Sequence, residues 1–266
     1  MEFSTNNVTA LNALFTALKK CGTIEQPFTF STTGIKLLTT ICKGTAIVHW
    51  VCPPNASYTC SYSSLEICLD IDTITSILTH NKDAQLLRIS LENSLSNYMH
   101  IHFKDEKRTR EYKVALLNGD GDANRITESA LISVNTLNDS VKIPCIEFKQ
   151  FVSEVNSHNI ATIRITYSKG IFLRMEARTL RMEATHIFHK DTYDFVSNSM
   201  DITSGQTITS AIPTRILLSI IKLTKASKFM KIYPSLVNNA PLVVEYDVND
   251  IGLVRFYLGT RIEDSE

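Results

Sequence analysis

The chain has 266 residues and carries 27 Lys and Arg against 27 Asp and Glu, so its formal net charge is zero. A hydrophobic content of 44% is typical of a globular protein with one large core or two modest ones. Proteins that grip nucleic acid by themselves are usually basic overall, so a DNA-binding role requires the basic side chains to gather on one surface.

The composition also argues against export and membrane insertion. The first ten residues are polar, so no secretory signal is expected. No stretch of 18 uncharged apolar residues occurs, so no membrane span is expected either. The six cysteines are scattered without a C-x-x-C pair, which favours reduced thiols in an intracellular protein.

The first half of the chain predicts two amphipathic helices, over residues 6–20 and 70–80. In both, apolar residues recur every three or four positions, which gives a helix one apolar face. Asp70 or Asp72 is a candidate cap for the second helix. Alternating or short apolar runs predict strands over residues 28–31, 35–38, 46–52, 85–91, 98–104 and 111–117.

Residues 118–139 then change in character, being rich in Gly, Asn, Asp, Ser and Thr. This composition predicts a linker between two domains, and the alternative is a long loop within one domain. Beyond it the helical pattern returns at residues 147–156 and 213–227, the latter with Pro213 in its first turn. Strands are predicted over residues 161–167, 171–175, 180–189, 207–211 and 228–233.

The C-terminal stretch predicts a hairpin. Residues 243–248 alternate with the two-residue period of a half-buried strand, and residues 253–258 repeat that alternation. The intervening Asn, Asp and Gly tolerate the backbone angles of a reversal.

Both halves therefore have the order helix, strands, helix, strands. A structural repeat explains this order most simply. We expect an α+β protein of two repeated domains, each with two helices packed on antiparallel sheets. The predicted boundaries are residues 1–118 for the first domain, 119–139 for the connecting linker and 140–266 for the second domain.

Several stretches resemble one family. The chain contains FTALKKCG, FTFSTTGIKLL and AIVHWV in its first half, VKIPCIEFKQFVSEV at the start of the second, and PLVVEY followed by DIGLVRFYL near its end. In this order they resemble the proliferating cell nuclear antigen family, the eukaryotic-type DNA sliding clamps, with divergence over residues 178–204. The resemblance leaves open whether the source is a cell or a large DNA virus.

The resemblance implies a DNA clamp fold that assembles into a homotrimeric ring around duplex DNA. Such a ring is a polymerase processivity factor that tethers replication and repair proteins, is opened by a clamp-loader ATPase, and works in the nucleus or at a viral replication site. Two alternatives are a subunit of a heterotrimeric checkpoint-type clamp, and a monomeric clamp-like scaffold or transcription accessory factor.

Charge placement fits such a ring, because residues 202–244 contain several Lys and Arg but no acidic residue. Basic side chains that face the hole would attract phosphates without reading bases. The alternative for each residue is an ordinary solvated side chain. The predicted DNA-facing residues are Lys19, Lys20, Lys82, Lys149, Arg215, Lys222, Lys225 and Lys228.

The resemblance implies two further surfaces. In the family, partner proteins insert a short peptide with an apolar plug into a pocket beneath the linker. Here that pocket would comprise Ile41, Gly44, Thr45, Ile47, Leu131, Ile132, Pro241, Tyr257 and Gly259. The ring would close by pairing edge strands of neighbouring protomers, which satisfies both edges. The predicted interface residues are Arg110, Tyr112, Val114, Leu116, Arg181, Glu183, Thr185 and Ile187.

Sequence signatures of catalysis are missing. The chain has no phosphate-binding glycine loop, zinc-protease motif or nucleophile elbow, so neither an enzyme nor a cofactor is expected. His100 and His102 share one strand face and could hold a metal. Because no Cys or carboxylate stands nearby at ligand spacing, solvated or cross-strand histidines are the preferred interpretation.

Overall fold

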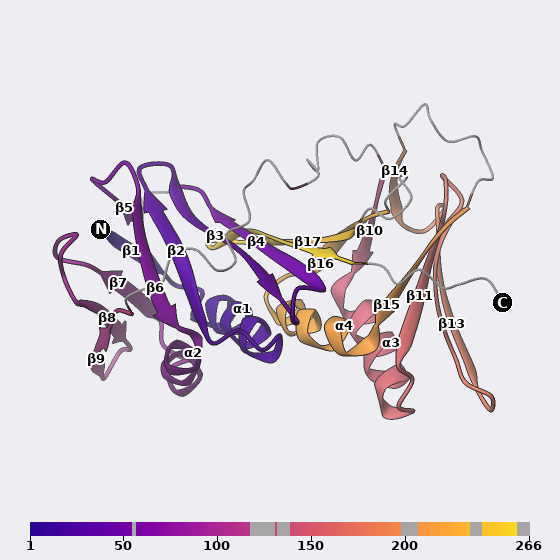
Figure 1. The fold of residues 1–266 in the computed structure, drawn as a ribbon, viewed down its shortest axis with the longest axis horizontal. Coiled ribbons are helices and arrows are strands. Elements are labelled where there is room, and N and C mark those ends of the chain that lie inside the picture. The colour runs from indigo at the N-terminus through magenta and orange to yellow at the C-terminus, as the bar shows by residue number, and fades with distance from the viewer. Residues whose placement is uncertain (55–56, 118–130, 132–138, 198–206, 235–240, 260–266) are drawn as a thin grey trace. The chain divides into compact units, whose positions relative to one another are not determined.

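A computed structural model describes residues 1–54, 57–117, 131, 139–197, 207–234 and 241–259 (Figure 1). The chain divides into two compact units. The first comprises Met1–Lys43, Val48–Ile126 and Asp247–Val254, and the second comprises Gly44–Ile47, Thr127–Tyr246 and Arg255–Glu266. Apart from Leu131 and Asp139, the predicted linker lies outside the described residues, and Asp139 already belongs to a strand.

The first unit contains two helices and two antiparallel sheets. The strands β5, β1, β7, β8 and β9 form one sheet in that order, and β4, β3, β2 and β6 are consecutive neighbours in the other. In chain order the elements of this part are β1 (Glu2–Thr5), α1 (Val8–Lys20), β2 (Glu25–Ser31), β3 (Gly34–Ile41), β4 (Ala46–Cys52), β5 (Tyr58–Thr59), β6 (Leu65–Asp70), α2 (Ile71–His80), β7 (Leu86–Ser90), β8 (Tyr98–Lys104) and β9 (Thr109–Ala115).

Both helices of this unit begin at a side-chain cap. Asn7 accepts a hydrogen bond from the backbone N–H of Ala10 at 3.1 Å, and Asp70 accepts one from the N–H of Asp72 at 2.9 Å. These bonds satisfy backbone donors that have no partner inside the helix. The predicted helices and the cap at Asp70 are therefore confirmed, with a start two residues later for α1.

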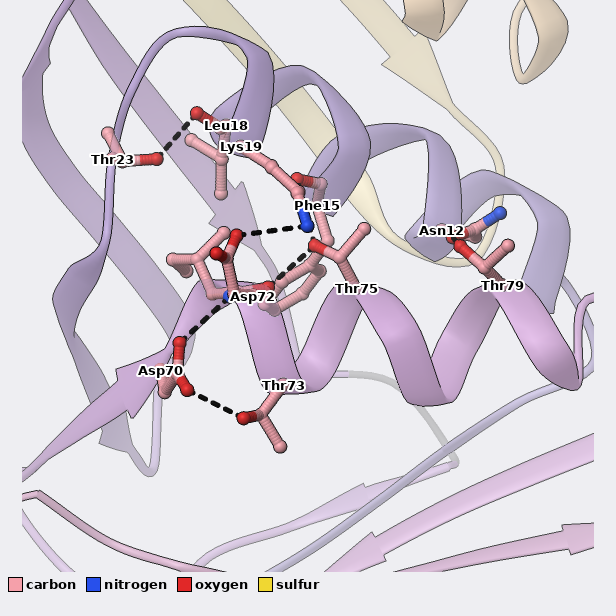
Figure 2. Close-up of polar contacts among 11 residues, drawn as sticks. Asn12, Phe15, Leu18, Lys19, Thr23, Asp70, Asp72, Thr73, Thr75 and Thr79 are labelled. Carbon is pink, nitrogen blue, oxygen red and sulfur yellow. Dashed lines mark hydrogen bonds and ion pairs between the residues drawn. The ribbon is translucent and has the colours of Figure 1, made fainter.

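Helices α1 and α2 pack side by side, and Figure 2 shows the polar contacts that join them. The Thr75 hydroxyl lies within hydrogen-bond distance of the Phe15 carbonyl, at 3.3 Å, and of the Ile71 carbonyl, at 2.6 Å. Lys19 forms a half-exposed ion pair with Asp72 at 3.2 Å. Apart from Thr75, the buried faces of both helices consist of apolar residues, so packing rather than these contacts supplies most of the stability.

The second unit likewise has two helical segments, and its strands belong to two of the three sheets that the described residues form. The strands β13, β12, β11 and β15 form one sheet in that order, and β14, β10, β16 and β17 are consecutive neighbours in the other. Its elements are β10 (Asp139–Pro144), α3 (Cys145–Ser157), β11 (Thr162–Ser168), β12 (Phe172–Arg178), β13 (Glu183–His189), β14 (Asp194–Ser197), β15 (Thr207–Pro213), α4 (Thr214–Ile220), the 3₁₀ helix η3 (Ile221–Lys225) and β16 (Phe229–Tyr233), followed by β17 (Leu242–Val248) and β18 (Gly252–Leu258).

The predicted helix over residues 213–227 differs most from the structure. Pro213 ends strand β15 and occupies the N-cap position with extended backbone angles, so the helix begins at Thr214. From Ile221 onward the α-helix tightens into 3₁₀ geometry, as helix ends commonly do. There the Thr224 hydroxyl donates to the Ile221 carbonyl at 2.7 Å, which satisfies a carbonyl of the last turn.

The predicted C-terminal hairpin is confirmed by β17 and β18, whose bounds agree with the prediction within one residue. Asp250 and Gly252 in the turn have positive φ angles of 70° and 86°, the conformation that Gly, Asn and Asp tolerate best. Among the described residues, no helix combines the length and the apolar character needed to span a membrane.

Candidate functional site

A small apolar cluster in the second unit brings together side chains from the strands β4, β16, β17 and β18, together with Leu131. Tyr233, Val243 and Tyr257 are buried, and Ile47 and Leu131 pack against them while remaining partly exposed. Three of these residues, Ile47, Leu131 and Tyr257, belong to the predicted peptide pocket. The cluster therefore has a buried floor and two apolar side chains that reach solvent.

Strand register explains how this floor forms. In the antiparallel pair of β16 and β17, Tyr233 stands opposite Val243 and Lys231 stands opposite Glu245. Directly opposite residues point to the same side of a sheet, and residues two apart along a strand share a face. The same face of the sheet thus carries the apolar pair at one position and the charged pair at the next.

A buried carboxylate adjoins the cluster. Glu245 is only 4% exposed, and its carboxylate accepts a hydrogen bond from Arg255 Nε at 2.7 Å and one from the Tyr233 hydroxyl at 3.1 Å. Lys231 Nζ adds an ion pair at 3.6 Å. Burial, together with the charge of Glu245, raises the pKa of Tyr233 well above its ordinary value. The hydroxyl therefore stays protonated, and its bond to Glu245 holds the tyrosine ring in place.

We expect Glu245→Gln to destabilise the second unit by about 1–3 kcal/mol. The amide keeps an acceptor for Tyr233 but loses the charge that Arg255 requires, and hydrogen bonds to charged groups contribute about that much. Urea unfolding measures the change. The exposed Glu183→Gln is the matched control and should stay within about 0.5 kcal/mol of the parent. Equal losses in both variants would refute a structural role for Glu245.

The remaining predicted pocket residues are placed as follows. The Gly259 N–H donates to the Thr45 carbonyl at 3.0 Å, so these two residues are neighbours, and Gly44 precedes Thr45 in the chain. Pro241 is half-buried directly before β17, and Ile132 lies outside the described residues. Ile41 is buried in the first unit.

Sequence reasoning missed Tyr233 and Val243 as members of this site. Both occur in stretches whose alternation predicts strands, so each could be assigned to a strand face. The cross-strand register that sets them opposite each other is not visible in either stretch alone. The same register places Lys231 next to Glu245 in the sheet, although these two residues are also distant in sequence.

The predicted DNA-facing residues of the second unit lie on or beside its helices. Arg215 is on α4, Lys222 and Lys225 are on η3, Lys228 precedes β16, and Lys149 is on α3, which packs against α4 and η3. Arg215, Lys225 and Lys228 are exposed. Within the described part of the chain, no carboxylate forms an ion pair with any of these five side chains. They are therefore available to bind anions.

In the first unit the predicted basic residues are fewer. Lys19 and Lys20 occupy the last turn of α1, where cations interact favourably with the helix dipole, and Lys82 follows α2. The Lys19 ion pair with Asp72 neutralises part of this charge. The cationic character of the helical surface is thus stronger in the second unit than in the first.

The predicted interface strands occupy sheet edges. Strand β9 ends the five-stranded sheet and β13 ends the four-stranded sheet, as far as the described residues extend. On β13, Glu183, Thr185 and Ile187 are exposed. An unpaired strand edge presents free backbone donors and acceptors and can pair with another chain.

The interface residues predicted on and after β9 are more enclosed than those on β13. Val114 is buried, and the Tyr112 hydroxyl accepts a hydrogen bond from Asn81 Nδ2 at 3.1 Å. Arg110 donates to Asn81 Oδ1, and Leu116 follows the strand, with its N–H donating to the Asn97 carbonyl at 2.9 Å. Any contact through β9 would therefore use its backbone and its outward side chains. The remaining predicted interface residue, Arg181, does not belong to an edge strand and lies in the turn before β13.

Comparison with known proteins identifies the relationship. Residues 133–261 match the family described as "Proliferating cell nuclear antigen, C-terminal domain". A curated relative, the proliferating cell nuclear antigen of Caenorhabditis elegans, is 37% identical over 79 residues, which cover 28% of this chain and 30% of the relative. These matches show similarity to the proliferating cell nuclear antigen family, with the family model covering residues 133–261 of the 266.

Two solved structures extend the comparison to the whole chain. The proliferating cell nuclear antigen of Entamoeba histolytica superposes with a TM-score of 0.80 at 14% identity, covering 98% of both chains. A chain of the PCNA2–PCNA3 complex of Sulfolobus tokodaii gives a TM-score of 0.80 at 15% identity, covering 99% of this chain and 100% of that one. At such identities the likeness establishes the fold. The predicted α+β clamp fold of the proliferating cell nuclear antigen family is confirmed.

Proposed function

We propose that this chain is a DNA sliding clamp, a homotrimeric ring that encircles duplex DNA and tethers a polymerase and other replication and repair proteins. Its effect is topological: a tethered polymerase meets its template at a high effective concentration, without any catalysis by the clamp. A clamp-loader ATPase would open the ring. The place of action is the nucleus, or a viral replication site if the source is a virus.

The observation that carries this proposal is the clamp fold of the whole chain combined with the family's C-terminal domain. The unpaired basic side chains on α4 and η3 support it, because they suit phosphate contacts that are independent of base sequence. A neutral net charge is compatible with a ring that must slide, since few phosphate contacts give weak binding.

The test uses linear duplexes in which the ends are either free or blocked by a bulky protein. A ring threads onto free ends without a loader and is trapped when the ends are blocked afterwards. We expect retention only on duplexes that were open during incubation. Equal retention on duplexes blocked from the start would mean surface binding, and the encircling function would then be wrong.

We also propose that the apolar cluster of Ile47, Leu131, Tyr233, Val243 and Tyr257 binds the apolar side chain of a short partner peptide. The buried floor is rigid because Glu245 holds Tyr233, and the partly exposed Ile47 and Leu131 supply the wall. Well-packed apolar sites of this kind concentrate the binding energy of an interface.

The double variant Ile47→Ala with Leu131→Ala is expected to weaken capture of a polymerase-tail peptide by roughly a hundredfold. Each truncation removes contact area from a hot spot, and such losses are about 1–2 kcal/mol each. Fluorescence polarisation with a labelled peptide measures the affinity. Val196→Ala, which truncates another exposed apolar residue of the same unit, is the control. Unchanged capture by the double variant would exclude this cluster as the peptide site.

A second candidate is one subunit of a heterotrimeric clamp. The Sulfolobus tokodaii structure favours it, because that structure is a complex of PCNA2 with PCNA3, two different chains. Light scattering separates the candidates: a homotrimer has three times the 29.9 kDa mass of the chain. A monomer that forms a ring only with added partner chains would establish the heterotrimer, and a monomer without DNA retention would favour a clamp-like scaffold.

A further inference from the structure

Three side chains with metal-binding atoms meet on the five-stranded sheet of the first unit. Nδ1 of His100 lies 3.3 Å from Oε1 of Glu111, and Nε2 of His102 lies 3.9 Å from the same oxygen. The ligand atoms of all three residues lie within 4.8 Å of one another. The two imidazole rings are nearly parallel, at an angle of 15°, with centroids 6.2 Å apart.

The strand geometry brings these groups together. His100 and His102 are two residues apart on β8 and so share one face, while the alternate residues Met99, Ile101 and Phe103 are buried on the other. In the antiparallel pair of β8 and β9, Glu111 stands directly opposite His102. This register places the carboxylate of Glu111, which is nine residues from His102 in sequence, beside both imidazoles.

The observed distances suit a shared metal ion better than a strong ion pair. A charge-assisted hydrogen bond between nitrogen and a carboxylate oxygen is about 2.7–2.9 Å long. In a tetrahedral zinc site with bonds of about 2.0–2.1 Å, neighbouring ligand atoms are roughly 3.3–3.4 Å apart. The separations of 3.3 and 3.9 Å between the carboxylate oxygen and the two imidazole nitrogens are close to that spacing, and all three ligand atoms lie within 4.8 Å of one another.

The surroundings leave this position open to an ion. The nearest cationic neighbours on the same face are Arg88, opposite His102 on β7, and Lys113, opposite His100 on β9. Arg88 pairs with Glu2, and Lys113 Nζ lies over the Tyr98 ring, 4.3 Å from its centroid. Both cations therefore have partners of their own. The imidazoles are half-buried and Glu111 is exposed, so a metal would retain an open coordination position for water.

We propose that His100, His102 and Glu111 form a binding site for Zn²⁺ or a related divalent transition metal. Two nitrogens and one carboxylate are ligands that such metals prefer, whereas Mg²⁺ and Ca²⁺ prefer oxygen alone. The ligands would be His100 Nδ1, His102 Nε2 and a carboxylate oxygen of Glu111. The site lies within the first unit and needs neither DNA nor ring closure.

The test is calorimetric titration of the full chain with Zn²⁺, and with Co²⁺ as a spectroscopic probe. We expect one ion per chain. His102→Ala and Glu111→Gln should each weaken metal binding at least tenfold. Removal of a group that only supports a metal ligand already lowers metal affinity by about 10–100-fold, and these two residues would be ligands themselves. His158→Ala, an exposed histidine of the second unit, should bind as the parent does. Thermal unfolding without metal confirms that each variant is folded.

The absorption spectrum of bound Co²⁺ distinguishes binding at the proposed site from binding by cysteine thiols. The six cysteines, all within the described residues, form no disulfide, and Cys42 and Cys60 are not fully buried, so their thiols could bind the added metal instead. Cysteine ligands would give an intense sulfur-to-cobalt charge-transfer band, whereas the proposed ligands give only weak visible bands. Absence of binding, a thiolate band, or equal affinity in His102→Ala would each overturn the proposal and leave a simple cross-strand pair. These outcomes are independent of the clamp experiments.

Discussion

Ile187→Glu is expected to convert the proposed trimeric ring into monomers. Ile187 lies on the edge strand β13 and is 39% exposed, so its apolar side chain is accessible to a neighbouring chain that pairs with this edge. Pairing of β13 with an edge strand of a neighbouring protomer would cover it. A carboxylate there would be buried without a partner at each seam.

The expected cost is about 3 kcal/mol or more for each seam, since an uncompensated buried charge costs that much. This weakens each contact by more than roughly a hundredfold, enough to dissociate the ring at micromolar concentration. The separate chain should tolerate the change, because Ile187 is exposed there and a carboxylate at this position would remain solvated.

Light scattering at matched concentrations measures the result, with unfolding curves to verify the monomer. The control is Ile146→Glu, which places the same charge on an exposed residue of α3 rather than on an edge strand. We expect the control to keep the mass of the parent. If Ile187→Glu also stays trimeric, β13 is not part of the seam.

The sequence predicts the elements that are long or strongly periodic. The helix over residues 70–80 and its cap at Asp70 agree with the structure to within a residue, because the apolar face and the cap are both local signals. The strands β6 and β10, of six residues each, were not predicted, and neither were the short strands β1, β5 and β14. With two to four residues each, the short strands show too little alternation, and they are strands because of the neighbours they pair with.

The candidate sites show the same difference between features that follow from local sequence and features that depend on strand pairing. Edge strands and basic helix surfaces follow from local patterns and from the family resemblance. The floor formed by Tyr233 and Val243, and the approach of Glu111 to two histidines, both depend on the register between strands. Register is fixed by the packing of whole sheets, so a reading of single stretches does not reveal it.

The second large effect concerns the hairpin turn: Gly252→Ala is expected to destabilise the first unit by about 2–5 kcal/mol. Gly252 has a φ of +86°, which costs an alanine about 1–2 kcal/mol. In addition, a Cβ at this position would lie 2.2 Å from the Val51 carbonyl oxygen and 2.9 Å from the Cys52 Cα. Because these are backbone atoms, the strands themselves would have to separate.

A matched control isolates that steric contribution. Gly22, which follows α1 in the same unit, has a similar φ of +77°, but a Cβ there would meet nothing within 4 Å. Gly22→Ala should therefore cost only the conformational term of about 1–2 kcal/mol. Urea unfolding of the two variants, compared by midpoint and slope, measures the difference. If both variants lose the same stability, the backbone around Gly252 can move far enough to accommodate a Cβ beside Val51 and Cys52. Glycine would then be needed at position 252 for its backbone angles alone.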